Sequence, residues 1–204
     1  STKNDYIIEL ASQYGLGVMV NESESNKGND YNFALNAVDT ELVTIVHQDD
    51  LYDRNYAKEV LKHYKKNEDA SIIFTDYYEI FGDKKIKKSM NLFKKRICLW
   101  PLKYKFLNNK KLFKRLALRF QKAICTSSIT FIKKNIESDL FPIDLIYNND
   151  WYALEQLSLN NNRFSMIPLK LVGYRIEDNY EKNNEQIKED IIKRASSISF
   201  FPNP

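Results

Sequence analysis

The sequence predicts an α/β protein in which helices flank a mostly parallel, Rossmann-like sheet. Short apolar segments rich in β-formers alternate along the chain with amphipathic segments of helical period. Apolar residues make up 43% of the 204 residues, which is enough to build a core. The chain has no internal repeat and no low-complexity linker. We therefore predict a single domain over residues 1–204.

The first part of the chain contains two predicted helices and two predicted strands. In order, we expect a helix at 4–14 that ends at Gly15 or Gly17, a short buried strand at 17–20, a polar loop at 21–30, a helix at 31–38 and a strand at 41–47. The segment 41–47 (ELVTIVH) is apolar and is bounded by polar residues, so we expect a central strand. Its carboxyl end is then a natural place for a ligand.

The second part continues the alternation. We expect a helix at 55–65, one strand or two at 71–81, a strand at 127–132, a helix at 148–159, extended segments at 163–176 broken at Pro168, and a polar helix at 183–195. The helix at 55–65 is clearly amphipathic, with Tyr56, Val60 and Tyr64 at helical spacing.

Cysteine use and hydropathy exclude several classes of protein. Cys98 and Cys125 are isolated from each other, and no CxxC pattern occurs, which argues against a zinc site or a disulfide scaffold and indicates a reducing compartment. The chain has no run of 18 apolar residues, so no membrane-spanning segment is expected. The first residues lack the pattern of a signal peptide.

Charge is strongly segregated although the net charge is only +4. The segment 84–122 contains 15 Lys or Arg and no acid, so the rest of the chain is acidic. Apolar residues at 112, 113, 116 and 120 fall on one helical face there, and this stripe either packs on the domain itself or meets a membrane. We predict an anionic membrane surface as the partner, contacted by Lys103, Lys111, Lys114, Arg115 and Arg119. Nucleic acid is disfavoured because no recognition motif accompanies the basic segment.

The loop after the strand at 41–47 presents His47, Gln48, Asp49 and Asp50 together. Two adjacent carboxylates repel each other, so a cation is needed to keep both ionised. Oxygen ligands suit Mg²⁺ or Mn²⁺. The alternative is a pair of turn residues that caps the helix beginning near Asp53.

The surroundings of this loop resemble those of family 2 glycosyltransferases, which have the GT-A fold. An N-x-G motif (Asn26, Gly28) and an A-x-N motif (Ala34, Asn36) precede the strand that ends in HQDD. HQDD-LY is most similar to the DQDD-IW motif of a rhamnosyltransferase-like branch. The resemblance implies that Asp49, Asp50 and His47 hold a divalent metal against the diphosphate of a nucleoside diphosphate sugar. It assigns the donor side to Asn26, Gly28, Asn36, Gln48 and Arg175, the last in a YR pair followed by Glu177 where the family has His.

The second half continues the resemblance, in the segments TSSITF (126–131) and FPIDLIYNNDWYALEQL (141–157). By position, the resemblance makes Asp150 the general base of an inverting transfer, and Ser128, Asn149 and Trp151 acceptor contacts. A base must lie within about 3 Å of the hydroxyl that it deprotonates. The alternative for Asp150 is an ordinary helix N-cap.

The resemblance also implies a division of the domain. Residues 1–83 would form a donor and metal half, 84–124 a basic helical insertion, and 125–204 an acceptor half with a C-terminal helix. Ser1-Thr2 resembles the end of a DD-G-S-T motif, so the family's first two strands are expected to be missing and donor binding by this chain to be weak.

The implied function is an inverting glycosyltransferase acting on a lipid-linked or saccharide acceptor of bacterial surface polysaccharide. Its implied location is the cytoplasm, at the inner face of the cell membrane. The alternative is a truncated or degenerate domain that binds a membrane or a partner without catalysis.

Overall fold

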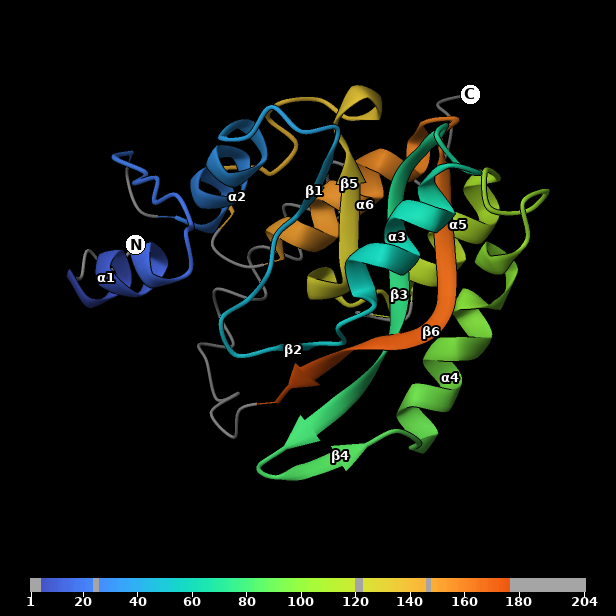
Figure 1. The fold of residues 1–204 in the computed structure, drawn as a ribbon. Coiled ribbons are helices and arrows are strands. Elements are labelled where there is room, and N and C mark those ends of the chain that lie inside the picture. Colours follow the sequence, from blue (N-terminus) through green and yellow to red (C-terminus); the bar gives the residue numbers. More distant parts are fainter. Residues whose placement is uncertain (1–4, 24–25, 120–122, 146–147, 177–204) are drawn as a thin grey trace.

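The computed structural model describes residues 5–23, 26–119, 123–145 and 148–176. These residues form a six-stranded sheet in the order β1-β5-β3-β6-β2, with β4 paired to β3 (Figure 1). The strands are β1 (Leu42–Thr44), β2 (Leu51–Tyr52), β3 (Ala70–Phe81), β4 (Lys84–Ile86), β5 (Ile129–Ile132) and β6 (Arg163–Arg175). The α-helices are α1 (Asp5–Gln13), α2 (Lys27–Asn36), α3 (Tyr56–Tyr64), α4 (Met90–Leu99), α5 (Lys111–Arg119) and α6 (Asn149–Leu159).

The prediction of a mostly parallel sheet is wrong. Among the described strands, β3 and β6 are the one parallel pair, whereas β1–β5, β3–β5, β2–β6 and β3–β4 are antiparallel. One cause is local, because two residues connect β3 to β4 and Gly82 adopts a φ of +54° there, which folds the chain straight back. The alternation of strands and helices therefore predicted the α/β class but not the strand directions.

The two longest strands, β3 and β6, pair with each other, and the other strands pair with one of them or with β5. β3 is one strand rather than two, and β6 bends without a break at Pro168 (Figure 1). The register passes from Thr75–Ile167 directly to Asp76–Lys170, so Pro168 and Leu169 have no partner on β3. Proline cannot donate to a ladder and is tolerated at such a bulge.

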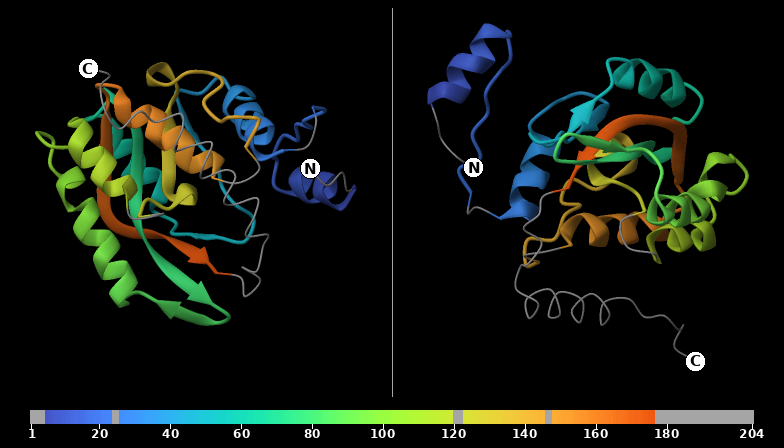
Figure 2. Two further views of the ribbon diagram at one scale, coloured as in Figure 1. Left: turned by 180° about the vertical axis from the view of Figure 1, so that it is seen from behind. Right: turned by 90° about the horizontal axis from the view of Figure 1, so that it is seen from below.

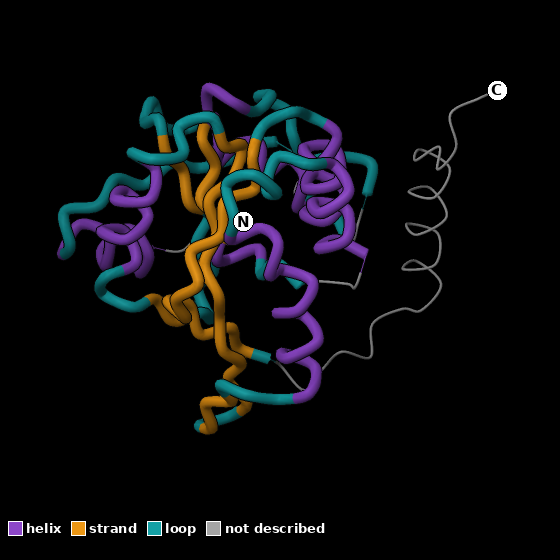
Figure 3. Tube along the Cα trace, turned by 90° about the vertical axis from the view of Figure 1, so that its right-hand side faces the viewer, coloured by secondary structure: helices purple, strands orange, loops and turns teal. Residues whose placement is uncertain are grey.

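Helices cover both faces of the sheet, which Figure 3 shows edge-on and Figure 2 shows from behind and below. One apolar cluster joins Ile72 and Phe74 of β3 to Leu118 of α5 and Leu154 of α6. A second cluster joins Ile73 of β3 to α3 and to one residue of α4. Because successive strand residues face opposite ways, a fully buried strand supplies both clusters.

The N-terminal segment differs from its prediction. α1 forms and Gly15, with a φ of +64°, follows it, but none of its residues is buried. Residues 17–20 are exposed and are not a strand, so their apolar character does not reflect a place in the core. α2 begins at Lys27, inside the predicted loop. The predicted residues Glu177, Phe120 and 183–195 lie outside the described residues, as does Asn4.

The basic segment forms β4, α4, a short 3₁₀ helix (Trp100–Lys103) and α5. Its predicted apolar face on α5 is only partly right. Phe113 packs against the core, but Leu112 is 72% exposed, and Ala117 and Leu118 are the buried residues. Lys114 is fully buried, and its Nζ donates to the carbonyl oxygens of Asn160 and Asn162. The membrane contact predicted for Lys114 is therefore wrong, because its ammonium caps the C-terminal end of α6.

The other four residues predicted at a membrane surface reach solvent. Lys103, Lys111 and Arg119 are exposed, and Arg115 is half-buried. In the part of the chain that the structure describes, we find no helix with the length and apolar character needed to cross a bilayer.

Candidate functional site

The HQDD loop lies between β1 and β2 and gathers three potential metal ligands. One ligand atom from each of His47, Asp49 and Asp50 lies within 4.8 Å of the other two. Asp50 is buried, His47 and Asp49 are half-buried, and Gln48 is exposed. Neither aspartate caps α3, whose N-cap is Asn55 without a side-chain capping bond. The capping alternative for this pair is therefore wrong.

Asp50 is the most constrained member of the cluster. Its Oδ1 accepts a hydrogen bond of 2.9 Å from the backbone N–H of Arg175, at the end of β6. Its Oδ2 is buried without a hydrogen-bond partner among the described residues. The Nδ1 of His47 lies 4.0 Å from Oδ2. A buried carboxylate oxygen without a donor is unfavourable unless a cation compensates it, so these residues fit a divalent ion.

His47 is oriented by Tyr31 of α2. The Tyr31 hydroxyl lies 3.2 Å from Nε2 of His47, and the two rings stack with centroids 6.2 Å apart. When Nε2–H donates to the Tyr31 oxygen, the lone pair of Nδ1 is left toward Asp50. Metal-bound histidines are usually held by such a partner on the other ring nitrogen.

Tyr31 also connects the cluster to Asp150. Burial, together with the negative charges of Asp150 and Asp30, raises the pKa of Tyr31 to about 12. The hydroxyl therefore stays protonated at neutral pH, and Asp150 lies near enough for its charge to act on Tyr31. Tyr31 thus contacts the HQDD loop and lies within electrostatic range of Asp150.

Asp150 lies in the first turn of α6, beside a small pocket. Its Oδ2 accepts a hydrogen bond of 2.5 Å from the Thr126 hydroxyl, and its Oδ1 accepts one of 2.9 Å from the backbone N–H of Trp151. The pocket is lined by Leu118, Ala123, Ile124, Thr126, Asp150, Trp151 and Leu154. The N-cap of α6 is Asn148, so Asp150 is not the cap. It is a half-buried, oriented carboxylate at an opening.

The comparisons with known proteins identify the family. The family model described as glycosyl transferase family 2 matches residues 1–141. The chain belongs to glycosyl transferase family 2. No curated protein matches it.

Family membership makes the chain a glycosyltransferase domain and implies a nucleotide-sugar donor and an acceptor. The mixed α/β architecture with its curled sheet is consistent with the GT-A fold. The family match includes the HQDD loop and ends before Asp150 and Arg175.

Three residues of this glycosyltransferase that were predicted to bind the donor hold α2 to the segment 138–143. The side chain of Asn26 caps α2 and donates to the carbonyl of Ile143, and Asn36 donates to the carbonyl of Ser138. A Cβ on Gly28 would lie 2.2 Å from the Pro142 carbonyl oxygen, so only glycine fits. The donor contact predicted for the buried Gly28 is corrected to this packing role, while those of Asn26 and Asn36 stay predictions.

Two of the three predicted acceptor contacts are also wrong. Ser128 is fully buried and donates to the carbonyl of Cys125. Asn149 is 2% exposed, and its amide donates to the carbonyls of Pro142 and Leu145. Trp151 does line the Asp150 pocket, held there by a bond from its Nε1 to the carbonyl of Leu118.

Arg175, which the YR motif predicted to bind the donor, contacts the backbone of the HQDD loop. Its Nε donates to the carbonyl of Asp49 at 3.0 Å, and its Nη1 lies 3.4 Å from the carbonyl of Gly82. Arg175 therefore fixes the shape of the loop. Sequence reasoning missed Tyr31, which belongs to no motif, and gave no role to Thr126 within TSSITF, because both act through contacts between distant segments.

Proposed function

We propose that this domain is a metal-dependent, inverting glycosyltransferase that moves a sugar from a nucleoside diphosphate sugar to an acceptor hydroxyl. The observation that carries the proposal is Tyr31, which contacts His47 of the HQDD cluster and is influenced by the charge of Asp150. A metal cluster and a general base that serve one reaction must lie around one substrate. The nearness of Tyr31 to both His47 and Asp150 supports that arrangement.

The cluster formed by His47, Asp49 and Asp50 is the proposed site for Mg²⁺ or Mn²⁺. Its support is the Oδ2 of Asp50, which has no hydrogen-bond partner in the described part of the chain, and the oriented imidazole of His47. A divalent ion bound there supplies positive charge against the diphosphate of the donor. Arg175 keeps the Asp49 backbone in place, and Gln48, the exposed member of the four HQDD residues, is available to the donor.

Asp150 is the proposed general base. Thr126 and the Trp151 backbone hold its two oxygens in a fixed orientation. The acceptor hydroxyl would give its proton to Asp150 while its oxygen bonds to the anomeric carbon and the bond from that carbon to the diphosphate breaks. Trp151 offers an indole surface beside the same pocket, which suits the apolar face of a sugar ring.

The HQDD-LY sequence supports placing the chain in the rhamnosyltransferase-like branch. On that basis we propose that the acceptor is a growing bacterial surface polysaccharide or its lipid-linked form, used at the inner face of the cell membrane. A panel of nucleoside diphosphate sugars that includes a deoxythymidine diphosphate rhamnose tests this choice. Turnover of other donors with the rhamnose donor untouched would contradict it.

The base is tested by Asp150→Asn, which keeps the shape of the side chain but removes its basicity. We expect donor turnover to fall by about 10²–10⁴-fold while donor binding is retained, as is typical for loss of a general base. Asp144→Asn is the matched control, because Asp144 is an exposed acid in the preceding loop. Unchanged turnover in Asp150→Asn would contradict the assignment.

The metal site is tested without reference to activity. Calorimetric titration with Mn²⁺ should show binding to the wild-type chain and strongly weakened binding to Asp50→Asn, whereas Asp53→Asn should bind as wild type. Equal binding by all three proteins would place the metal elsewhere. If the wild-type chain turns over no donor with either metal, the non-catalytic alternative replaces the proposal.

A further inference from the structure

The outer face of α4 is apolar although no described element covers it. Met90, Phe93, Ile97 and Trp100 follow one another at helical spacing and are 69%, 59%, 57% and 54% exposed. The inner face of the same helix is also apolar, with Leu92 and Leu99 buried. A helix that only covers its own domain needs one apolar face, so the second face requires another explanation.

The exposed face continues beyond the end of α4 as a row of aromatic rings. The centroid of Trp100 lies 5.1 Å from that of Tyr104, which lies 5.9 Å from that of Phe106. Phe106 is 71% exposed. We call the six side chains of this continuous surface the α4 patch: Met90, Phe93, Ile97, Trp100, Tyr104 and Phe106. Contiguous exposed apolar surface of this kind marks an interaction site.

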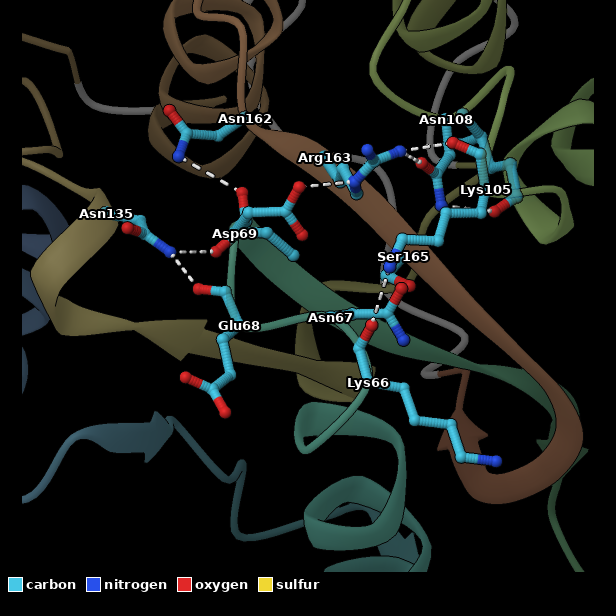
Figure 4. A network of polar contacts seen from close by, with 12 residues as sticks. Lys66, Asn67, Glu68, Asp69, Lys105, Asn108, Asn135, Asn162, Arg163 and Ser165 are labelled. Atoms are coloured by element: carbon cyan, nitrogen blue, oxygen red, sulfur yellow. Dashed lines mark hydrogen bonds and ion pairs between the residues drawn. The ribbon is translucent and has the colours of Figure 1, made fainter.

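The loop that carries Phe106 is firmly attached, as Figure 4 shows. Arg163 at the start of β6 pairs with Asp69 at 2.5 Å and donates to the side chain of Asn108 and the carbonyl of Lys105. The backbone N–H of Phe164 donates to the carbonyl of Asn108. The aromatic row is thus presented by a braced loop.

The basic side chains of α4 lie on two sides of the helix, one facing the sheet and one facing solvent. Lys95 and Arg96 turn inward and pair with Glu79 and Asp76 of β3. The bases that remain exposed among and after the patch residues are Lys94, Lys103, Lys105, Lys110 and Lys111. Since the segment 84–122 contains no acid, no neighbour in the sequence offsets these charges.

We propose that the α4 patch docks on the surface of an anionic phospholipid bilayer. Aromatic and aliphatic side chains enter the boundary between headgroups and acyl chains, while lysines pair with the anionic headgroups. A second copy of the chain fits less well, because it would bring two basic surfaces together. The proposal does not depend on the chemistry at Asp150, and it moves the membrane contact from α5 to α4.

The first test is flotation of the full chain with vesicles of phosphatidylcholine alone or mixed with an equal part of phosphatidylglycerol. We expect binding to the mixed vesicles that falls with added salt. The double variant Phe93→Ser/Trp100→Ser should lower partitioning by about ten-fold or more, since two large apolar side chains no longer enter the interface. Leu61→Ser is the matched control, because Leu61 is 52% exposed on α3. It should bind as wild type.

The second test separates charge from apolar contact. Lys94→Gln/Lys103→Gln should weaken binding to the mixed vesicles by about five-fold per charge, while Lys58→Gln on α3 should not change it. Thermal unfolding of each variant checks that the fold is kept.

Three results would overturn the proposal. One is equal partitioning of the wild type and the double variant, and another is binding that ignores phosphatidylglycerol content. The third is a dimer in sedimentation, or a complex with single-stranded RNA, that the double variant abolishes while vesicles remain unbound.

Discussion

Helices α4 and α5 come from the same basic segment, yet they meet different surroundings. α5 packs against α6 and buries Ala117, Leu118 and even Lys114. α4 buries Leu92 and Leu99 but leaves a second apolar face in solvent. The amphipathic pattern in the sequence predicted a helix where α5 lies, but it did not predict α4 and did not reveal which face another element covers.

α4 and α5 differ in burial because α6 packs against α5, whereas no described helix packs on the outer face of α4. The last carbonyls of α6 need donors, and Lys114 supplies them from α5. A lysine with a long apolar stem can satisfy such carbonyls while its methylenes fill the core. Counting Lys114 among surface charges was therefore reasonable from the sequence and wrong in the structure.

The largest expected effect contrasts a buried residue of α5 with an exposed residue of α4. Leu118→Ala should lower the free energy of unfolding by about 2–5 kcal/mol, as buried leucine truncations do, because Leu118 is 3% exposed. Ile97→Ala on the outer face of α4 should change it by less than about 0.5 kcal/mol. Urea denaturation measures both. A large loss for Ile97→Ala would mean that the outer face of α4 contributes to the fold.

An intermediate effect is expected where α4 is fastened to the sheet. Arg96→Met leaves Asp76 without its ion-pair partner at a site where that carboxylate side chain is only 10% exposed. The loss should be about 2 kcal/mol, less than for a fully buried pair because Arg96 is partly exposed. Lys94→Met, an exposed neighbour, should be nearly neutral in the same denaturation experiment. Equal effects would show that the Arg96–Asp76 pair does not anchor α4.

The smallest effect concerns pH and α5. Burial lowers the pKa of Lys114 to about 8 from its ordinary value of 10.5. Between these pH values the unfolded chain keeps a proton that the folded chain has lost, so stability from this group rises with pH, by on the order of 1 kcal/mol.

Lys114→Met should remove this rise, which is measured as the difference between the two proteins in urea denaturation at pH 8 and at pH 10. Parallel pH profiles would indicate that Lys114 keeps an ordinary pKa. In that case Lys114 on α5 would titrate like the exposed lysines around α4.

Local pattern predicted the elements and the ligand cluster well. The helix containing Val60, the strands around Ile73 and Phe131 and the helix containing Leu154 all lie where periodicity placed them. HQDD follows an apolar strand as expected, although β1 lies at the edge of the described sheet and not at its centre. His47, Asp49 and Asp50 come together because they share one loop. Features carried by consecutive residues need no knowledge of the rest of the fold.

Contacts between distant segments were not predictable in this way. Gly28 is required by Pro142, and Asn149 is occupied by the segment before α6, so motif residues that looked ready to bind a ligand are used internally. Tyr31, which connects the HQDD loop to Asp150, has no sequence signature. Such roles depend on which loops the fold brings together, and that information is not local.

The bulge in β6 fixes the number of residues between the first part of this strand and Arg175 at its end. Pro168 and Leu169 have no partner on β3, and from Lys170 onward the pairing leads to Arg175, whose backbone holds Asp50. Shortening this stretch by one residue would turn every later side chain to the opposite face. Insertions and deletions should therefore not be tolerated between Pro168 and Arg175, where length itself is part of the site.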